Sequence, residues 1–270
     1  MDGFSVVLPA YQEASGLASS LERLLVFLRA FAPGGDWELI VVDDGSTDGT
    51  AAIVERARAA DPRRIRLLQH PVNLGLTAAL ETGAAAALKP IVVVIDADLS
   101  YAPETIGALV SAYRETGATC ALASPYMPGG EVANVPFSRL AASVVANRLL
   151  SWCARGRVKT LTGMVRAYDA RLLCELLARR GDAEFNAWAV AVMLAGKQPL
   201  VEIPARLAWP DYRRKAAGRL GLRSLSRRVG GVLAAAACLI GSEPSPASFS
   251  EKSGTFVPAE LGGSLMRSGR

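Results

Sequence analysis

The sequence predicts an α/β fold: a Rossmann-like, mostly parallel sheet with helices on both faces. Three observations support this prediction. Short apolar runs alternate with segments of helical periodicity through the first half of the chain. These runs are apolar at almost every position, as in parallel strands that are covered on both faces. Acidic residues follow three of the runs, at the sheet edge where open α/β folds bind ligands.

The expected elements follow in chain order. The apolar runs predict strands at 5–8, 38–42, 65–69, 91–95 and 119–123. Helices between them are expected at 15–31, 48–60, 74–87 and 103–115, with Asp48 suited to cap the second. Residues 124–136 (SPYMPGGEVANVP) are rich in Gly and Pro and predict a loop. Further helices near 137–155, 168–180 and 184–196 precede a short strand at 200–203.

A basic segment follows the last predicted strand. Residues 206–228 carry eight Arg or Lys against one acid, Asp211, whereas the whole chain has a net charge of +5. Three of the arginines recur every four residues, with Leu and Val on another face: Arg219, Arg223 and Arg227. This pattern predicts a basic amphipathic helix on an anionic membrane surface. A solvated basic face is the alternative interpretation.

The apolar run at 230–241 has about 12 residues, fewer than the ~20 needed to span a bilayer. No transmembrane helix is therefore expected. The start of the chain, 1–7, is too short and too polar for a signal peptide. We expect a cytoplasmic protein held peripherally on the inner face of the membrane. Ser, Gly and Pro are frequent after residue 242, which predicts a disordered tail.

Several functional classes are disfavoured by composition and motifs. The four cysteines are scattered and His70 is the one histidine, which argues against a disulfide framework, a zinc site and a His-dependent triad. Neither a P-loop nor a dinucleotide fingerprint occurs. A D-x-D phosphatase would carry its nucleophile after the first strand, where this chain has Pro9 and Ala10. Aromatic residues are not interleaved with the basic charges, so no nucleic-acid partner is expected.

Acidic turns follow the first, second and fourth predicted strands, at 9–13 (PAYQE), 43–48 (DDGSTD) and 96–100 (DADLS). Because parallel strands end at one edge of a sheet, these carboxylates are expected to converge on one crevice. Several carboxylates close together repel one another unless a cation or a sugar hydroxyl separates them. The alternative for each aspartate is a helix cap or a turn former.

The spacing of Asp96 and Asp98 is the sharpest of these features. Two carboxylates one residue apart, where a strand enters a turn, can approach one hard cation. Mg²⁺ or Mn²⁺ prefers oxygen ligands and takes one or two carboxylates together with substrate phosphates. Tyr11 and Glu13 are interpreted as part of a pocket for a nucleotide base or ribose. The alternative is a tyrosine packed on the sheet edge beside an exposed glutamate.

Four segments together resemble the family 2 glycosyltransferases: LPAYQE (8–13), VVDDGSTDGT (41–50), NLG (73–75) and IDADLSYAPE (95–104). That family has the GT-A fold and uses nucleotide-diphosphate sugars. DADLS-x-x-PE is most similar to the branch that glycosylates polyprenyl or dolichyl phosphate, which includes dolichyl-phosphate mannose synthase. The resemblance implies an inverting transfer to an acceptor, with a lipid phosphate favoured. A hydroxyl acceptor with Asp182 or Glu184 as base, or a non-catalytic relative, stays as an alternative.

The resemblance also implies roles for individual residues. Nucleotide-sugar binding is implied for Pro9, Tyr11, Glu13, Val42, Asp44, Asp96, Ala97 and Asp98. Mg²⁺ or Mn²⁺ binding is implied for Asp98 and Asp96, with Ser100 where the branch often has Gln. Catalytic contacts to the diphosphate are implied for Asp98 and for the basic stretch Arg213, Arg214 and Lys215.

Three positions depart from the pattern of that branch. Pro125 stands where the branch has Arg, and Thr160 stands where it has Asp. Residues 186–188 (NAW) stand where an acid is common. We therefore expect the donor half to follow the family more closely than the acceptor half. The implied division is a GT-A catalytic domain at 1–205, with a nucleotide-sugar half at 1–125 and an acceptor half at 126–205, then a membrane-surface segment at 206–241 and a tail at 242–270.

Overall fold

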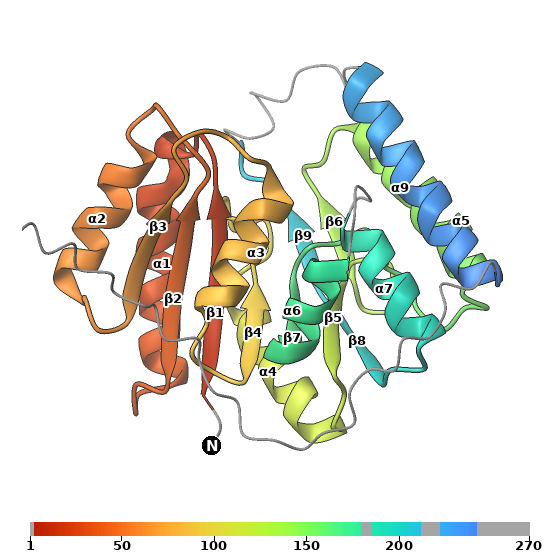
Figure 1. The fold of residues 1–270 in the computed structure, drawn as a ribbon, viewed down its shortest axis with the longest axis horizontal. Coiled ribbons are helices and arrows are strands. Elements are labelled where there is room, and N and C mark those ends of the chain that lie inside the picture. The colour runs from red at the N-terminus through yellow and green to blue at the C-terminus, as the bar shows by residue number, and fades with distance from the viewer. Residues whose placement is uncertain (1–2, 180–184, 212–221, 242–270) are drawn as a thin grey trace, which may run out of the picture.

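The computed structural model describes residues 3–179, 185–211 and 222–241 of the 270-residue chain. A seven-stranded sheet runs through its centre in the order β3-β2-β1-β4-β7-β5-β8 (Figure 1). Six strands are parallel: β1 (Phe4–Ala10), β2 (Trp37–Asp43), β3 (Ile65–Gln69), β4 (Ile91–Val94), β5 (Cys120–Ser124) and β8 (Leu200–Pro204). Strand β7 (Arg166–Asp169) is antiparallel to both of its neighbours. The predicted α/β fold with a mostly parallel sheet is confirmed.

Helices cover both faces of the sheet. One face carries α1 (Ala14–Phe31), α2 (Thr50–Ala60) and α4 (Glu104–Thr116). The other carries α3 (Leu76–Ala86), α6 (Ala170–Arg179) and α7 (Phe185–Ala195). Alternate residues of β1 pack into the two helix layers: Val6 and Leu8 pack toward α1, whereas Val7 packs toward α3. Burial on both faces explains why the strands read as continuous apolar runs.

Three strands were not predicted from the sequence. Strand β7 lies partly where a helix was expected at 168–180, and helix α6 begins only at Ala170. Strands β6 (Glu131–Ala133) and β9 (Arg206–Ala208) pair in a second, two-stranded sheet. They lie in the expected loop at 124–136 and at the start of the basic segment. Strands of three or four residues with charged members carry too little periodicity to be recognised, and only their tertiary partners define them.

Two long helices, α5 (Phe137–Cys153) and α9 (Leu222–Ile240), pack side by side outside α7 (Figure 1). The helix expected in the basic segment is therefore present from Leu222. One face of α9, including Val232, Ala235 and Ala236, packs against the core around α7. In the described residues, every helix is too short or too polar to cross a membrane. The basic stretch Arg213, Arg214 and Lys215 and the predicted tail at 242–270 lie outside the described residues.

Candidate functional site

The turn after β4 gathers the predicted metal-binding side chains. Leu99 adopts a left-handed backbone (φ 48°), which reverses the chain within the DADLS motif. A carboxylate oxygen of Asp98 accepts a 2.9 Å hydrogen bond from the backbone N–H of Ser100. The Ser100 hydroxyl donates to Oδ2 of Asp96 at 3.3 Å. Three oxygen-bearing side chains that are close in sequence are thus held together in one tight turn.

The turns after β1 and β2 are fastened to each other. The backbone N–H of Gln12 donates to Oγ of Ser46 at 3.0 Å, and its side-chain amide donates to Thr47 at 2.9 Å. The N–H of Glu13 donates to Oγ1 of Thr50 at 2.9 Å. These bonds fix the PAYQE turn against the DDGSTD turn, as two motifs that form one binding edge require.

Asp48 belongs to the same link. Its carboxylate accepts hydrogen bonds from the N–H of Thr50 (3.1 Å) and the N–H of Ala14 (3.0 Å), so it serves the first residues of both α2 and α1. Partial desolvation raises the pKa of Asp48, but the hydrogen bonds from Thr50 and Ala14 outweigh it and hold the pKa below its ordinary value. The prediction that Asp48 is the N-cap of this helix is wrong by one residue: Gly49 is the N-cap of α2, which begins at Thr50, and the Asp48 carboxylate accepts the Thr50 N–H from one residue further out.

Asp44 is buried and has several hydrogen-bond donors around its carboxylate. Backbone N–H groups of Leu74 and Gly75 donate to its two oxygens, each at 2.8 Å. Nδ1 of His70 lies 2.7 Å from Oδ1. The carboxylate therefore ties the NLG motif to the edge of the sheet, which links two motifs that are about 30 residues apart in sequence.

The other residues with implied nucleotide contacts lie around the same edge. Tyr11 is about half exposed, at 47%, and Glu13 is buried. Pro9 is half-buried at the end of β1, next to Val42 of β2. The side chain of Val42 is fully buried in the core beside α3. These assignments stay predictions.

A cavity of about 860 Å³ opens at the DADLS turn and extends between α5 and α9. Asp96, Asp98 and Ser100 line its polar end. Tyr101 lies beside them, and burial together with the Asp96 charge raises the pKa of its hydroxyl, which therefore stays protonated. The predicted residues Pro9, Tyr11, Glu13, Val42, Asp44 and Ala97 are not among the described residues that line it.

The far end of the cavity is apolar. Val145 and Leu149 of α5 line it at 66% and 42% exposure, and Val229 and Leu233 of α9 line it at 49% and 61%. Sequence reasoning did not identify this wall, because it forms only where two helices some 80 residues apart pack together. Amphipathic periodicity predicts that each helix has an apolar face, but it does not predict which other helix packs beside that face.

The model of Glycosyl transferase family 2 matches residues 5–173, which is more than half of the chain. The chain belongs to this family. It is 34% identical over 171 residues to the polyprenol monophosphomannose synthase of Mycolicibacterium smegmatis, covering 62% of each chain. It is 33% identical over 135 residues to the dolichol-phosphate mannosyltransferase of Pyrococcus furiosus, covering 50% of this chain and 36% of that one. The chain thus spans less than two thirds of the length of these curated relatives.

Solved structures of GT-A glycosyltransferases share the fold. A glucosyl-3-phosphoglycerate synthase from Mycobacterium tuberculosis, solved with Mn²⁺, UDP and glucosyl-3-phosphoglycerate, aligns with a TM-score of 0.61 at 21% identity, covering 90% of this chain and 82% of that one. A mannosyltransferase from Pyrobaculum calidifontis, solved with GDP-mannose and Mn²⁺, aligns at 0.54 and 21% identity, covering 90% and 77%. The GT-A fold expected from the sequence motifs is confirmed.

The donor atoms of this family 2 glycosyltransferase suit a hard divalent cation. Asp96, Asp98 and Ser100 offer only oxygen atoms at the polar end of the cavity. In the described residues no cluster of three or more His, Cys, Asp or Glu side chains could hold a metal by itself. Mg²⁺ and Mn²⁺ fit such a set, because they complete their coordination with water and substrate phosphates.

The positions that depart from the branch lie on this cavity. Pro125, Thr160, Asn186 and Ala187 line it, whereas Trp188 packs against the core. The Thr160 hydroxyl lies 2.6 Å from Oγ of Ser124, and its backbone N–H donates to Glu202 at 2.7 Å. Thr160 is therefore a buried part of the cavity wall, and both its hydroxyl and its backbone N–H are engaged in hydrogen bonds. Asp182 and Glu184, the alternative bases, lie outside the described residues.

Proposed function

We propose that this family 2 member is an inverting glycosyltransferase that moves a sugar from a nucleotide-diphosphate sugar to a polyprenyl-phosphate lipid. One observation carries the proposal: a single cavity has carboxylates at one end and an apolar wall at the other. With a divalent cation held by these carboxylates, the polar end would suit the anionic head of a polyprenyl phosphate, and the apolar wall would suit its hydrocarbon chain. The names of the relatives from M. smegmatis and P. furiosus support the same acceptor class.

The donor would bind at the edge formed by the PAYQE, DDGSTD and DADLS turns. Asp98, with Asp96 and Ser100, would hold Mg²⁺ or Mn²⁺, which when bound supplies positive charge against the diphosphate. The two neighbours solved with Mn²⁺ support this choice of ion. Arg213, Arg214 and Lys215 stay our candidates for a second contact to the diphosphate.

The chemistry would need little from the protein beyond positioning. An oxygen of the acceptor phosphate attacks the anomeric carbon, the bond from that carbon to the diphosphate oxygen breaks, and the nucleoside diphosphate leaves. A phosphate acceptor is already anionic near neutral pH, so no general base has to remove a proton. A hydroxyl acceptor would require such a base.

We also propose that the protein is cytoplasmic and attaches peripherally to the inner face of the membrane, where a lipid acceptor resides. The basic composition of residues 206–228 supports attraction to anionic lipids. The apolar wall residues Val145 and Leu233 are more than 60% exposed, which leaves hydrocarbon-binding surface open beside the cavity.

The experiment combines the protein, Mn²⁺, one radiolabelled nucleotide sugar at a time and polyprenyl phosphate, followed by lipid extraction. We expect a labelled lipid that mild acid cleaves, as expected for a sugar joined to a phosphate through its anomeric carbon. The matched control replaces polyprenyl phosphate with the free polyprenol. Transfer of label to the polyprenol would instead establish that a hydroxyl is the acceptor. Loss of that labelled product in Asp182→Asn or Glu184→Gln would establish that a carboxylate base assists the transfer.

A further inference from the structure

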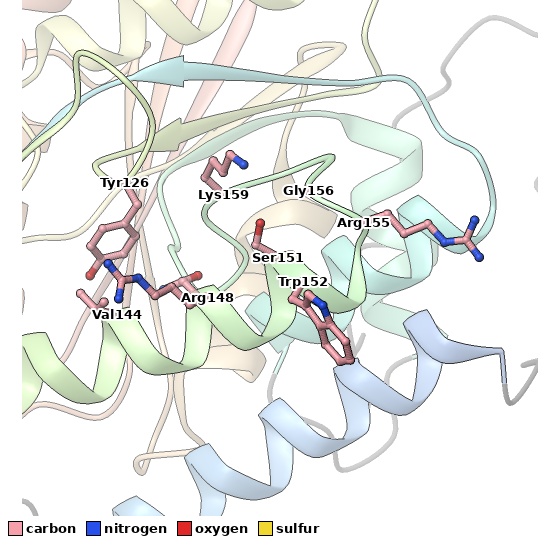
Figure 2. A pocket seen from close by; sticks show the side chains of 9 residues that line it. Tyr126, Val144, Arg148, Ser151, Trp152, Arg155, Gly156 and Lys159 are labelled. Atoms are coloured by element: carbon pink, nitrogen blue, oxygen red, sulfur yellow. The ribbon is translucent and has the colours of Figure 1, made fainter.

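A second pocket, of about 790 Å³, lies on a different face of α5 from the cavity at the DADLS turn. Tyr126 is the one described residue that lines both. Its other walls come from α5 and from the turn that follows that helix (Figure 2). The pocket is therefore separate from the carboxylates at Asp96 and Asp98.

The pocket is basic. Arg148, Arg155 and Lys159 line it, and no acidic side chain is among its described lining residues. In the described part of the chain, none of these three cations forms a side-chain ion pair. The nearby carboxylate of Glu202 accepts backbone N–H groups of Lys159 and Thr160 at 2.7–3.0 Å. Figure 2 shows Arg148 extending toward Tyr126 and Lys159 lying across from α5, whereas Arg155 extends away from both. Arg148 and Lys159 are therefore the two cations that an anion in this pocket would meet together.

The floor of the pocket is held rigidly. Asn147 accepts backbone N–H bonds from Leu161 (2.8 Å) and Thr162 (3.1 Å), and it donates to Oγ1 of Thr162 at 2.8 Å. After the helix, Arg155 and Gly156 have left-handed backbones (φ 55° and 74°). That reversal brings Lys159 back across from α5, over Ser151, as Figure 2 shows. The cations are thus presented on a fixed frame rather than on a loose tail.

An apolar strip runs along α5 beside the pocket. Val145, Leu149 and Trp152 recur at helical spacing and are 66%, 42% and 76% exposed. Exposed aromatic and aliphatic side chains next to Arg and Lys are typical of helices that lie at a membrane interface. A free phosphate ion would use the cations but would make no use of Trp152, which lines the same pocket and is 76% exposed.

We propose that Arg148 and Lys159 of this basic pocket bind the phosphate of an anionic phospholipid headgroup. The bound headgroup would place Trp152 against the acyl chains and turn the mouth of the neighbouring cavity, which Val145 and Leu149 line, toward the bilayer. This is a docking site for a bulk membrane lipid, distinct from the acceptor of the proposed reaction, and it does not require that sugar transfer occurs.

The test measures flotation with vesicles of phosphatidylcholine alone and of phosphatidylcholine mixed with phosphatidylglycerol, both free of polyprenyl phosphate. The variant R148Q/K159Q removes two cations of the pocket. The matched control R23Q/R56Q removes two exposed arginines of α1 and α2, on the opposite layer of the fold. At about 1 kcal/mol for each basic side chain at the surface, the pocket variant should bind the anionic vesicles about 30-fold more weakly. The control should bind like the wild type.

Three results would overturn the proposal. Equal loss in the pocket variant and the control would mean diffuse attraction without a site. Absence of wild-type binding to the anionic vesicles would exclude a headgroup site. Calorimetric binding of inorganic phosphate that R148Q/K159Q abolishes, and that displaces the protein from vesicles, would assign the pocket to a free phosphate. Nucleotide binding, measured in parallel by thermal shift, should be the same in all three proteins, so failure of the proposed function would be visible separately.

Discussion

The carboxylate of Asp44 and the ring of His70 are joined by a 2.7 Å hydrogen bond at the edge of the sheet. Nε2 of the same ring lies 2.9 Å from the hydroxyl of Thr82 in α3. The carboxylate also holds the N–H groups of Leu74 and Gly75, immediately before α3 begins at Leu76. Since Leu76 lines the cavity at the DADLS turn, Asp44 positions one rim of that cavity through the loop it binds.

Replacing Asp44 should therefore loosen the loop at 73–75. Asp44→Asn keeps the size of the side chain but puts an amide N–H where one of the N–H donors now points. Hydrogen bonds to a charged group contribute about 1.5–3 kcal/mol, so we expect the free energy of unfolding to fall by about 2 kcal/mol. Urea unfolding measures this change. Asp36→Asn is the control, because its ion pair with Lys89 is exposed and worth at most about 1 kcal/mol. Equal effects of the two substitutions would contradict the positioning role.

Asp98→Asn should preserve the fold and abolish metal-dependent donor binding. A ligand present at 100 times its Kd stabilises the folded state by about 2.7 kcal/mol. For the wild type we expect one of UDP, GDP, CDP or dTDP to raise the Tm when Mn²⁺ is present. Addition of EDTA should remove this increase in Tm. The variant should show no rise with the same nucleotide.

The control for that experiment is Glu22→Gln, an exposed acid of α1 on the layer away from the cavity. It should respond to nucleotide and Mn²⁺ like the wild type. If the Asp98→Asn protein keeps the Mn²⁺-dependent increase in Tm at limiting Mn²⁺, Asp98 is not the metal ligand. Loss of the rise in both variants would point to a general electrostatic effect.

Much of the donor edge was predictable from sequence because local rules govern it. Strands β1, β2 and β4 are buried on both faces, so they read as apolar runs, and the acidic turns follow at their ends. Because these strands pair in parallel, their carboxyl ends lie at one edge of the sheet, and the position of the three turns follows from the strand prediction alone. The roles of single carboxylates were less accessible. The sequence suggested that Asp44 meets the nucleotide, but it did not show that His70 and the 73–75 loop bind this carboxylate.

The acceptor side depends on contacts that no local pattern encodes. Strand β7 interrupts the parallel order by inserting antiparallel between β4 and β5, and its four residues include Arg166 and Asp169. The apolar wall needs α5 and α9 to pack together. The periodicity in the basic segment predicted an amphipathic helix lying on a membrane surface, whereas one face of α9, with Val232, Ala235 and Ala236, packs against the core.

Arg166 should be one of the most sensitive structural positions. Its guanidinium is buried and donates to the carbonyl oxygens of Leu161 (2.6 Å) and Asn186 (2.8 Å) and to the hydroxyl of Tyr168 (3.0 Å). Burial raises the pKa of Tyr168 to about 12, so that hydroxyl stays neutral beside the cation. In the described residues this buried cation has no carboxylate partner.

Arg166→Leu would leave two buried carbonyl oxygens without donors, at about 1–3 kcal/mol each, so we expect a loss of about 3 kcal/mol in the free energy of unfolding. Arg166→Lys keeps the positive charge but cannot reproduce the several donors of the planar guanidinium group. Its free energy of unfolding should therefore lie between those of Arg166→Leu and the wild type. Chemical denaturation compares the three proteins. Arg29→Leu, at an exposed position in the last turn of α1, should change stability little. A stable Arg166→Leu protein would mean that the carbonyls find water instead.

The apolar wall should select the acceptor without affecting the donor. Leu149→Gln together with Leu233→Gln replaces two half-exposed hydrocarbon surfaces at the far end of the cavity. Burying an apolar side chain of this size contributes about 1.5–3 kcal/mol when complete, and we take roughly half of that for each partly exposed side chain. The double variant should therefore raise the KM for polyprenyl phosphate by ten-fold or more, with an unchanged KM for the nucleotide sugar. Val26→Gln with Leu88→Gln removes comparable exposed apolar surface away from the cavity and serves as the matched control. If the wall variant instead lowers kcat at the same acceptor KM, the chain does not bind along α5 and α9, and the acceptor must approach the carboxylates from another side.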